Sequence, residues 1–152
     1  MNTRTRKIKS IHAFEQLSEI DDATGDEQVA LLKLYGAKLP LNMLLSLNFD
    51  NTIKLSLPEG MPELDLKHMD ANTHPDMAGL LSSSIHKLKY CLDSNKVMKS
   101  FQKEKVFYET LINIPLKDAE ILCSAKDHAL EELYPNITAE LVASVFPQYV
   151  KE

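Results

Sequence analysis

The chain of 152 residues is poor in the residues that several kinds of functional site require. It has four glycines and no tryptophan, and it contains no phosphate-binding loop, dinucleotide-binding fingerprint, nucleophile elbow or HExxH zinc motif. Four glycines provide little material for loops that cradle phosphate groups, so nucleotide chemistry is disfavoured. We therefore expect a binding function rather than an enzymatic one, with no cofactor.

The two cysteines are too few for a disulfide framework. Cys91 lies in the stretch KYCLD and Cys123 in EILCSA, so both have apolar neighbours. We expect two reduced thiols in the core of an intracellular protein, with a disulfide between them or a nucleophilic thiol as the alternatives. His128 is poorly placed as a base for Cys123, because a spacing of five residues does not bring two side chains together on a helix.

Long hydrophobic runs are absent from the sequence. The longest, LPLNMLLSL at residues 39–47, is much shorter than the roughly 18 residues that a membrane-spanning helix needs. The first ten residues, MNTRTRKIKS, are basic, and no apolar stretch of the kind found in secretory signals follows them. We expect a soluble protein that makes no use of a membrane.

The spacing of apolar residues predicts helices along most of the chain. Apolar residues recur every three or four positions, as on one face of a helix. Residues 50–58 differ, because Ile53, Leu55 and Leu57 alternate with polar residues and favour a short extended segment. The length is typical of one domain. We predict a compact all-α domain over residues 11–152, preceded by a basic arm at residues 1–10. Its six to seven helices are expected near residues 11–20, 26–36, 40–48, 77–92, 97–112, 116–133 and 138–146.

The stretch DLKHMDANTHPDM at residues 65–77 is the most suggestive candidate for a metal site. His68 and Asp70, and again His74 and Asp76, form two copies of an H-x-D pattern, and imidazole and carboxylate groups are common metal ligands. The spacing matches no established ligand motif, however. Asn, Thr and Asp are also turn and capping residues, and Pro75 suits the first turn of a following helix. The interpretation that we favour is a polar loop without metal.

Basic residues gather in two places in a chain whose net charge is −5. The first is the N-terminal arm, with Arg4, Arg6, Lys7 and Lys9. The second is a lysine-rich region, with Lys87, Lys89, Lys96, Lys99 and Lys103. In the predicted helix after Asn95, Lys96, Lys99 and Lys103 would form one stripe. Both regions are candidate contacts for an acidic protein or a nucleic acid, and the alternative is that they are only solvated surface.

Three stretches together resemble a family of small uncharacterised proteins of tailed bacteriophages, chiefly T4-like myoviruses. They are NFDNTIKLSLPEGMP, PLKDAEILCSAKDHALEELYPNIT and LVASVFPQ. The matching positions are Asn48, Phe49, Asp50, Ile53, Leu57, Pro58, Glu59, Gly60 and Pro62 in the first stretch; Ala119, Glu120, Leu122, Cys123, Lys126, Asp127 and Leu130 in the second; and Thr138, Val142, Phe146 and Pro147 in the third. We expect Lys126 and Asp127 to form a charge pair at a helix junction, or alternatively on a partner surface.

The resemblance implies a viral gene product in the cytoplasm of a bacterial host, or in the virion. It implies no catalytic residues. The first hypothesis is an accessory protein that binds a host or phage protein of the replication, transcription or defence machinery. The second is a minor structural component of the head or neck. The third is a nucleic-acid-binding accessory protein that uses the basic arm and the lysine-rich region. A metal-dependent enzyme built on residues 65–77 is the least favoured.

Overall fold

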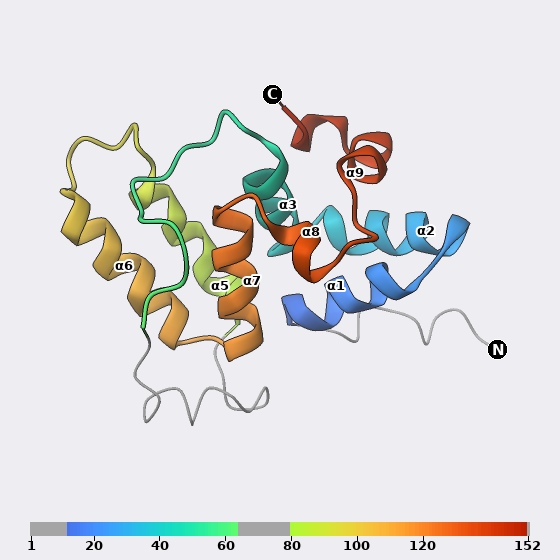
Figure 1. Cartoon of the computed structure of the whole chain (residues 1–152), viewed down its shortest axis with the longest axis horizontal. Coiled ribbons are helices and arrows are strands. Elements are labelled where there is room, and N and C mark those ends of the chain that lie inside the picture. Colours follow the sequence, from blue (N-terminus) through green and yellow to red (C-terminus); the bar gives the residue numbers. More distant parts are fainter. Residues whose placement is uncertain (1–11, 64–79, 152) are drawn as a thin grey trace.

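Helices make up most of the structure, and no β-strand occurs in the residues that it describes. The computed structural model describes residues 12–63 and 80–151, so the basic arm and the two H-x-D patterns lie outside it. Figure 1 shows the arrangement. The α-helices are α1 (Ala13–Asp22), α2 (Gly25–Gly36), α3 (Leu41–Phe49), α5 (Leu81–Ser84), α6 (Ser100–Ile112), α7 (Leu116–Lys126), α8 (Leu130–Leu133) and α9 (Ala139–Val145), with 3₁₀ helices η2 (Ile85–Cys91) and η3 (Pro147–Tyr149). The prediction of a compact all-α fold is confirmed.

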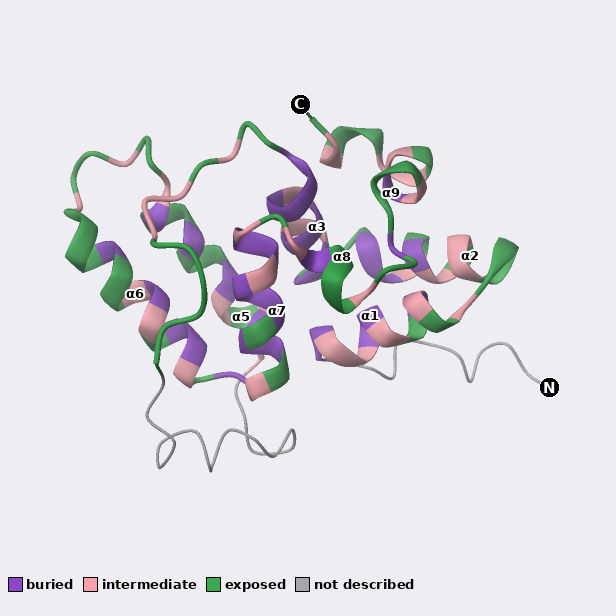
Figure 2. Ribbon diagram, in the orientation of Figure 1, coloured by how far each residue is buried: buried purple, intermediate pink, exposed green. Residues whose placement is uncertain are grey.

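Helix α7 lies at the centre of the molecule. It packs against α1, α3, α6 and α8. In Figure 1 it separates α1 and α2 on one side from α5 and α6 on the other. Seven of its eleven residues are buried, and Figure 2 shows the buried positions spreading from α7 into α3. Small residues such as Ala119 and Ala125 let neighbouring helices approach it closely.

The hydrophobic core is built from apolar side chains of several helices. Leu17 and Ile20 of α1, Leu32 of α2 and Leu111 of α6 are all fully buried. Six of the nine residues of α3 are buried, as its leucine-rich sequence predicts. Each large aliphatic side chain removed from water stabilises the fold by about 1.5–3 kcal/mol. None of the helices in residues 12–63 and 80–151 is long and apolar enough to cross a membrane.

The prediction of an α-helix at residues 77–92 is wrong for most of the residues that the structure describes there, because residues 85–91 form a 3₁₀ helix. The α-helical turn α5 ends at Ser84, and the chain continues as the 3₁₀ helix η2. The buried residues of η2 are Ile85, Leu88 and Cys91, which are three positions apart. A repeat of three is the period of a 3₁₀ helix, so the burial pattern matches the helix that forms.

The predicted helix at residues 116–133 is divided into α7 and α8, and the α-helix count therefore exceeds the prediction. The break is at His128, whose φ angle is +58°. His128 Nδ1 lies 2.7 Å from the carbonyl oxygen of Asn48, and the Asn48 side chain accepts a hydrogen bond of 3.0 Å from the backbone N–H of Leu130. Asn48, which is 80 positions from His128, thus provides the acceptor for the first backbone N–H of α8, that of Leu130.

The extended segment after α3 is short, as predicted. It forms two isolated β-bridges, one between Asp50 and Lys151 and one between Leu55 and Leu92. Together they tie residues 50–56 to the C-terminus and to the end of η2. The last predicted helix is also confirmed, since Thr138 caps α9 by accepting a hydrogen bond from the N–H of Leu141 at 3.1 Å.

Candidate binding site between the 57–62 loop and helix α6

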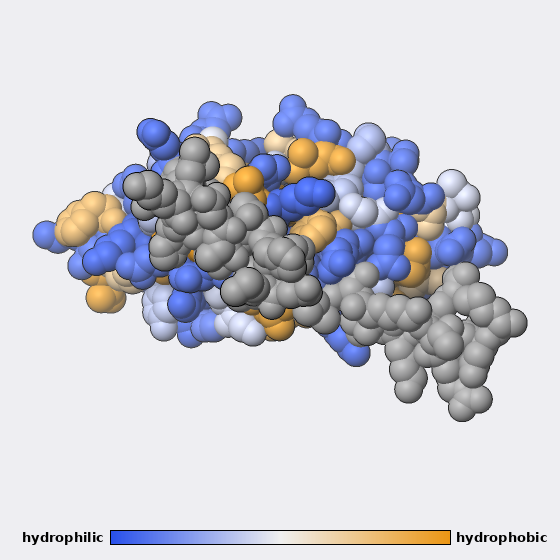
Figure 3. All heavy atoms as spheres, turned by 90° about the horizontal axis from the view of Figure 1, so that it is seen from below, coloured by the Kyte–Doolittle hydropathy of each residue, from blue (hydrophilic) through white to orange (hydrophobic). Residues whose placement is uncertain are grey.

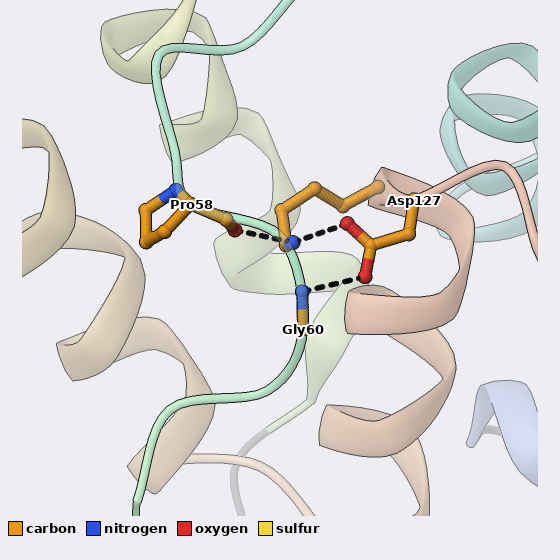
Figure 4. Close-up of polar contacts among 4 residues, drawn as sticks. Pro58, Gly60 and Asp127 are labelled. Atoms are coloured by element: carbon orange, nitrogen blue, oxygen red, sulfur yellow. Dashed lines mark hydrogen bonds and ion pairs between the residues drawn. The ribbon is translucent and has the colours of Figure 1, made fainter.

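A buried lysine fastens the 57–62 loop to the C-terminal end of α7 (Figure 4). Lys126 Nζ donates hydrogen bonds to the carbonyl oxygen of Pro58 at 2.8 Å and to Asp127 Oδ1 at 2.6 Å. Asp127 Oδ2 accepts the backbone N–H of Gly60 at 2.9 Å. Gly60 has a φ of +86°, a conformation that glycine adopts without strain. The predicted charge pair at a helix junction is therefore present, and it positions the loop.

The fastened loop forms one wall of a pocket of about 360 Å³. Residues 57–62 line it on one side, and α6 provides Phe101, Glu104, Lys105, Phe107 and Tyr108 on the other. Phe107 is buried at the base, and the Lys126 ammonium lies 6.0 Å from its ring centroid. The lining combines aromatic and apolar surface with two carboxylates, those of Glu59 and Glu104, and the ammonium group of Lys105. Such a pocket can accept an apolar or aromatic group and fix its orientation by charge.

Large apolar side chains stand in water at the mouth of the pocket and beside it. Phe101 is 65% exposed and Met61 39% exposed, and both line the pocket. In the segment between η2 and α6, Val97 is 92% exposed. Figure 3 shows apolar atoms among hydrophilic ones at the left end of the molecule, where α6 begins. Single exposed apolar residues are ordinary, whereas a group of them beside a pocket makes this a candidate interaction surface.

The segment that carries Val97 is held in a defined turn. Asn95 Nδ2 donates to the carbonyl oxygen of Tyr90 at 2.9 Å, and Asn95 Oδ1 accepts the N–H of Val97 at 3.0 Å. At the start of α6, the Gln102 side chain accepts the N–H of Lys99 at 2.8 Å. The exposed apolar residues are thus presented by ordered backbone, which lowers the entropy cost of binding. Tyr90 near the end of η2 is 43% exposed, and we call Tyr90, Val97 and Phe101, the exposed apolar residues from η2 to the first turn of α6, the apolar corner.

The stripe predicted for Lys96, Lys99 and Lys103 does not form. Helix α6 begins only at Ser100, so Lys96 and Lys99 precede it and are exposed. Lys103 is just 3% exposed, and its Nζ donates to the carbonyl oxygen of Leu92 at 2.8 Å and to Ser56 Oγ at 3.2 Å. It bonds a carbonyl at the end of η2, where helical partners are lacking. Lys103 is a structural residue and not a surface contact.

The remaining predicted lysines lie on different faces of η2. Both Lys87 and Lys89 are exposed. Because a 3₁₀ helix has three residues per turn, Lys87 shares a face with Tyr90, and Lys89 shares another with Leu92. The ammonium of Lys89 lies 5.1 Å from the Tyr90 ring centroid. The single basic surface expected from the sequence is therefore divided into separate parts.

Comparison with known protein families finds a family that matches the part of the chain that contains this site. Residues 17–132 match a family of unknown function, DUF6433. The chain belongs to this family. No curated protein and no solved structure shows a significant match. The matched range includes every residue of the pocket together with Lys126 and Asp127, so the candidate site lies inside the part of the chain that defines the DUF6433 protein.

Some predicted site residues of the DUF6433 protein lie outside the described residues. These are Arg4, Arg6, Lys7 and Lys9 of the arm, and His68, Asp70, His74 and Asp76 of the H-x-D patterns. Within residues 12–63 and 80–151, no group of three or more His, Cys, Asp or Glu side chains could hold a metal ion. The residues that sequence reasoning missed are Met61, Phe101, Lys105 and Tyr108. Phe101 falls within the predicted helix at residues 97–112, and no site was predicted there apart from its lysines.

Both cysteines of the DUF6433 protein are free and buried, as predicted. Burial raises the pKa of each thiol to about 11. Cys91 also donates a weak hydrogen bond of 3.4 Å to the carbonyl oxygen of Lys103. Because the thiolate is the nucleophilic form, a raised pKa disfavours the role of nucleophile for either residue.

A buried carboxyl group that sequence reasoning missed joins α1 to α7. Burial raises the pKa of Asp118 to about 6, although a hydrogen bond from the Phe14 N–H at 2.8 Å and the nearby His12 act in the opposite direction. His12 Nδ1 lies 3.7 Å from Asp118 Oδ2. The group is fully buried and caps the beginning of α1, which is a structural role.

Proposed function

We propose that the protein is a non-enzymatic accessory factor of a tailed bacteriophage that docks on a host or phage protein of the replication, transcription or defence machinery. It would act in the cytoplasm of the bacterial host. The phage origin rests on the resemblance of the three motif stretches. The docking role rests on the pocket beside α6 and on the apolar corner.

The observation that carries the proposal is the exposure of Phe101 at the mouth of a pocket with an ordered wall. The Lys126–Asp127 pair holds the 57–62 loop in place, so the pocket exists before a partner arrives. A partner side chain that enters the pocket and covers Phe101 would remove a large aromatic surface from water, which is worth about 1.5–3 kcal/mol. Aromatic residues at the centre of a desolvated patch are the usual source of binding energy in protein interfaces.

The lysines that precede α6 favour an acidic partner. Lys96 and Lys99 are exposed there, whereas the pocket lining carries Lys105 together with Glu59 and Glu104. The ammonium groups of Lys96 and Lys99 stand out on a chain with a net charge of −5. An acidic patch on the partner would be steered to this end of the molecule and kept away from the acidic remainder.

The test is affinity capture from lysate of infected bacteria, with and without nuclease treatment. Three forms of the tagged full chain are compared: the natural sequence, Phe101→Ala, and Leu133→Ala as a matched control. Leu133 is a large apolar residue of α8 that is 43% exposed away from the pocket. We expect one dominant protein that survives nuclease treatment, is lost with Phe101→Ala and is retained with Leu133→Ala. Equal capture by both variants would contradict the proposed site.

A second candidate function is binding of single-stranded nucleic acid, and the apolar corner provides the observation that favours it. Tyr90 and Phe101 are exposed aromatic rings among exposed lysines. Base stacking on aromatic rings, together with lysines that follow phosphates, is how many proteins bind single strands. Recovery that is lost on nuclease treatment would favour this function. The Lys96→Ala/Lys99→Ala variant should then bind more weakly at low salt, and unchanged binding would exclude the site.

A further inference from the structure

A second hollow lies on a different part of the surface, between α3, the extended segment, η2 and η3. Its volume is about 380 Å³. The walls are mainly aliphatic side chains, namely Met43, Leu47, Ile53, Leu55, Leu88 and Leu92. We call it the α3–η2 groove. It shares no lining residue with the pocket beside α6, and its existence does not depend on the proposed docking function.

One lysine lines this apolar groove, and its ammonium lies 5.1 Å from the ring centroid of Tyr90, which is not among the lining residues. Lys89 is the only charged residue among the described residues that line it. It reaches the groove because the three-residue turn of η2 places it on the same face as Leu92. No carboxylate of the described lining neutralises the ammonium. An occupant with one negative charge and an aliphatic body therefore complements the groove in both respects.

Asn42 contributes a carboxamide to the groove from α3, and its Oδ1 atom is buried without a partner. Oδ1 is a hydrogen-bond acceptor, so a carboxylate oxygen cannot satisfy it. The NH₂ group of the same amide is a donor from which a carboxylate oxygen can accept. The groove thus offers a donor on α3 as well as the cation on η2.

We propose that the α3–η2 groove binds an aliphatic carboxylate. The carboxylate would meet the Lys89 ammonium and the Asn42 amide, and the hydrocarbon would lie against the six aliphatic side chains. The volume lies within the 300–1,000 Å³ range of small-molecule sites, which are mostly apolar with a few orienting polar groups. The apolar corner of a second copy is a poorer occupant, because the exposed Lys96 and Lys99 beside it in the sequence would repel Lys89.

The experiment is a titration of the full ¹⁵N-labelled chain with sodium decanoate, followed by NMR. Saturable shifts are expected for amides around the groove, such as those of Ser46, Leu55 and Leu92. Decylammonium, with the same hydrocarbon and the opposite charge, should bind more weakly. The absence of saturable shifts with decanoate up to about 1 mM would overturn the proposal, and so would equal binding of the two compounds or shifts centred on the pocket beside α6.

Two lysines on the same 3₁₀ helix provide a matched pair of variants. Lys89→Gln removes the groove cation and should weaken decanoate binding by about two- to fivefold, the range for a solvent-exposed ion pair. Lys87→Gln removes an equally exposed charge from another face and should leave the affinity unchanged. Asn42→Asp, which keeps the side-chain shape and adds a negative charge, should weaken binding further. Equal effects at Lys87 and Lys89 would show that decanoate senses only net charge, and the site would be refuted.

Discussion

Replacement of Lys126 by methionine tests whether the anchored loop is stabilised as described. The change keeps an unbranched apolar side chain as long as the lysine hydrocarbon, but it removes the ammonium group. The Pro58 carbonyl and the Asp127 carboxylate then lose their common donor. If both acceptors were fully buried, the loss of each hydrogen bond from the ammonium would cost about 1.5–3 kcal/mol. Asp127 is 20% exposed and regains water, so we expect a loss of about 2 kcal/mol.

The assay is equilibrium unfolding by urea, with thermal unfolding as a second measurement. A loss of about 2 kcal/mol corresponds to a decrease in Tm of about 4 to 8 °C for a chain of this length. Lys33→Met is the control, since Lys33 is an exposed lysine within helix α2. A substitution of that kind should change the free energy of unfolding by less than about 0.5 kcal/mol. If Lys126→Met behaved like Lys33→Met, the loop would be held by something other than this pair.

Three further predictions concern the stability of the fold. Lys103→Met should lower the free energy of unfolding by about 1–3 kcal/mol because the Leu92 carbonyl loses its donor, whereas Lys99→Met at an exposed position should not; urea titration compares them. Gly36→Ala would place a Cβ atom 2.7 Å from Phe146 Cε2, so a loss of about 1–3 kcal/mol is expected, and an unchanged Tm would show that Phe146 moves aside freely. The raised pKa of Asp118, about 6, means that the folded state holds this proton more tightly than the unfolded state. The contribution of Asp118 to the free energy of unfolding, up to about 3 kcal/mol, is complete below about pH 4 and is lost as the pH rises through about 6. Asp118→Asn should therefore flatten the pH dependence of the free energy of unfolding in this range.

The positions of the helices and of the core could be predicted because they depend on local spacing. The cap at Thr138, the burial of α3 and the Lys126–Asp127 pair all follow from residues close to one another in the chain. The break between α7 and α8 could not, because it depends on Asn48, which is 80 residues from His128. No glycine or proline marks residues 127–129.

Errors at the candidate site have a different origin. Regular spacing indicates which residues share a face of a helix, but it does not indicate where the helix begins. Starting α6 at Ser100 instead of near Val97 leaves Lys96 and Lys99 outside it. The burial of Lys103 depends on the free carbonyl at the end of η2 and on Ser56, which a charge count does not reveal. Phe101 is exposed because it is one turn from Glu104 and Lys105, away from the buried face of α6 that carries Lys103, Thr110 and Leu111.

The residues of the motif pattern and the residues of α6 form different walls of the pocket. Lys126 and Asp127 belong to the pattern and hold the loop, and Pro58 and Gly60 of the pattern also line the pocket. Phe101 and Lys105 are not part of the pattern, and their side chains face the pocket. Variants can therefore distinguish residues that hold the pocket in place, which we call the frame, from residues that would contact a partner. Lys126→Met should reduce both stability and partner capture, whereas Phe101→Ala should reduce capture alone, because an exposed ring contributes little to the fold. If Phe101→Ala instead lowered the free energy of unfolding as much as Lys126→Met does, Phe101 would belong to the frame, and the pocket would lose its principal contact residue.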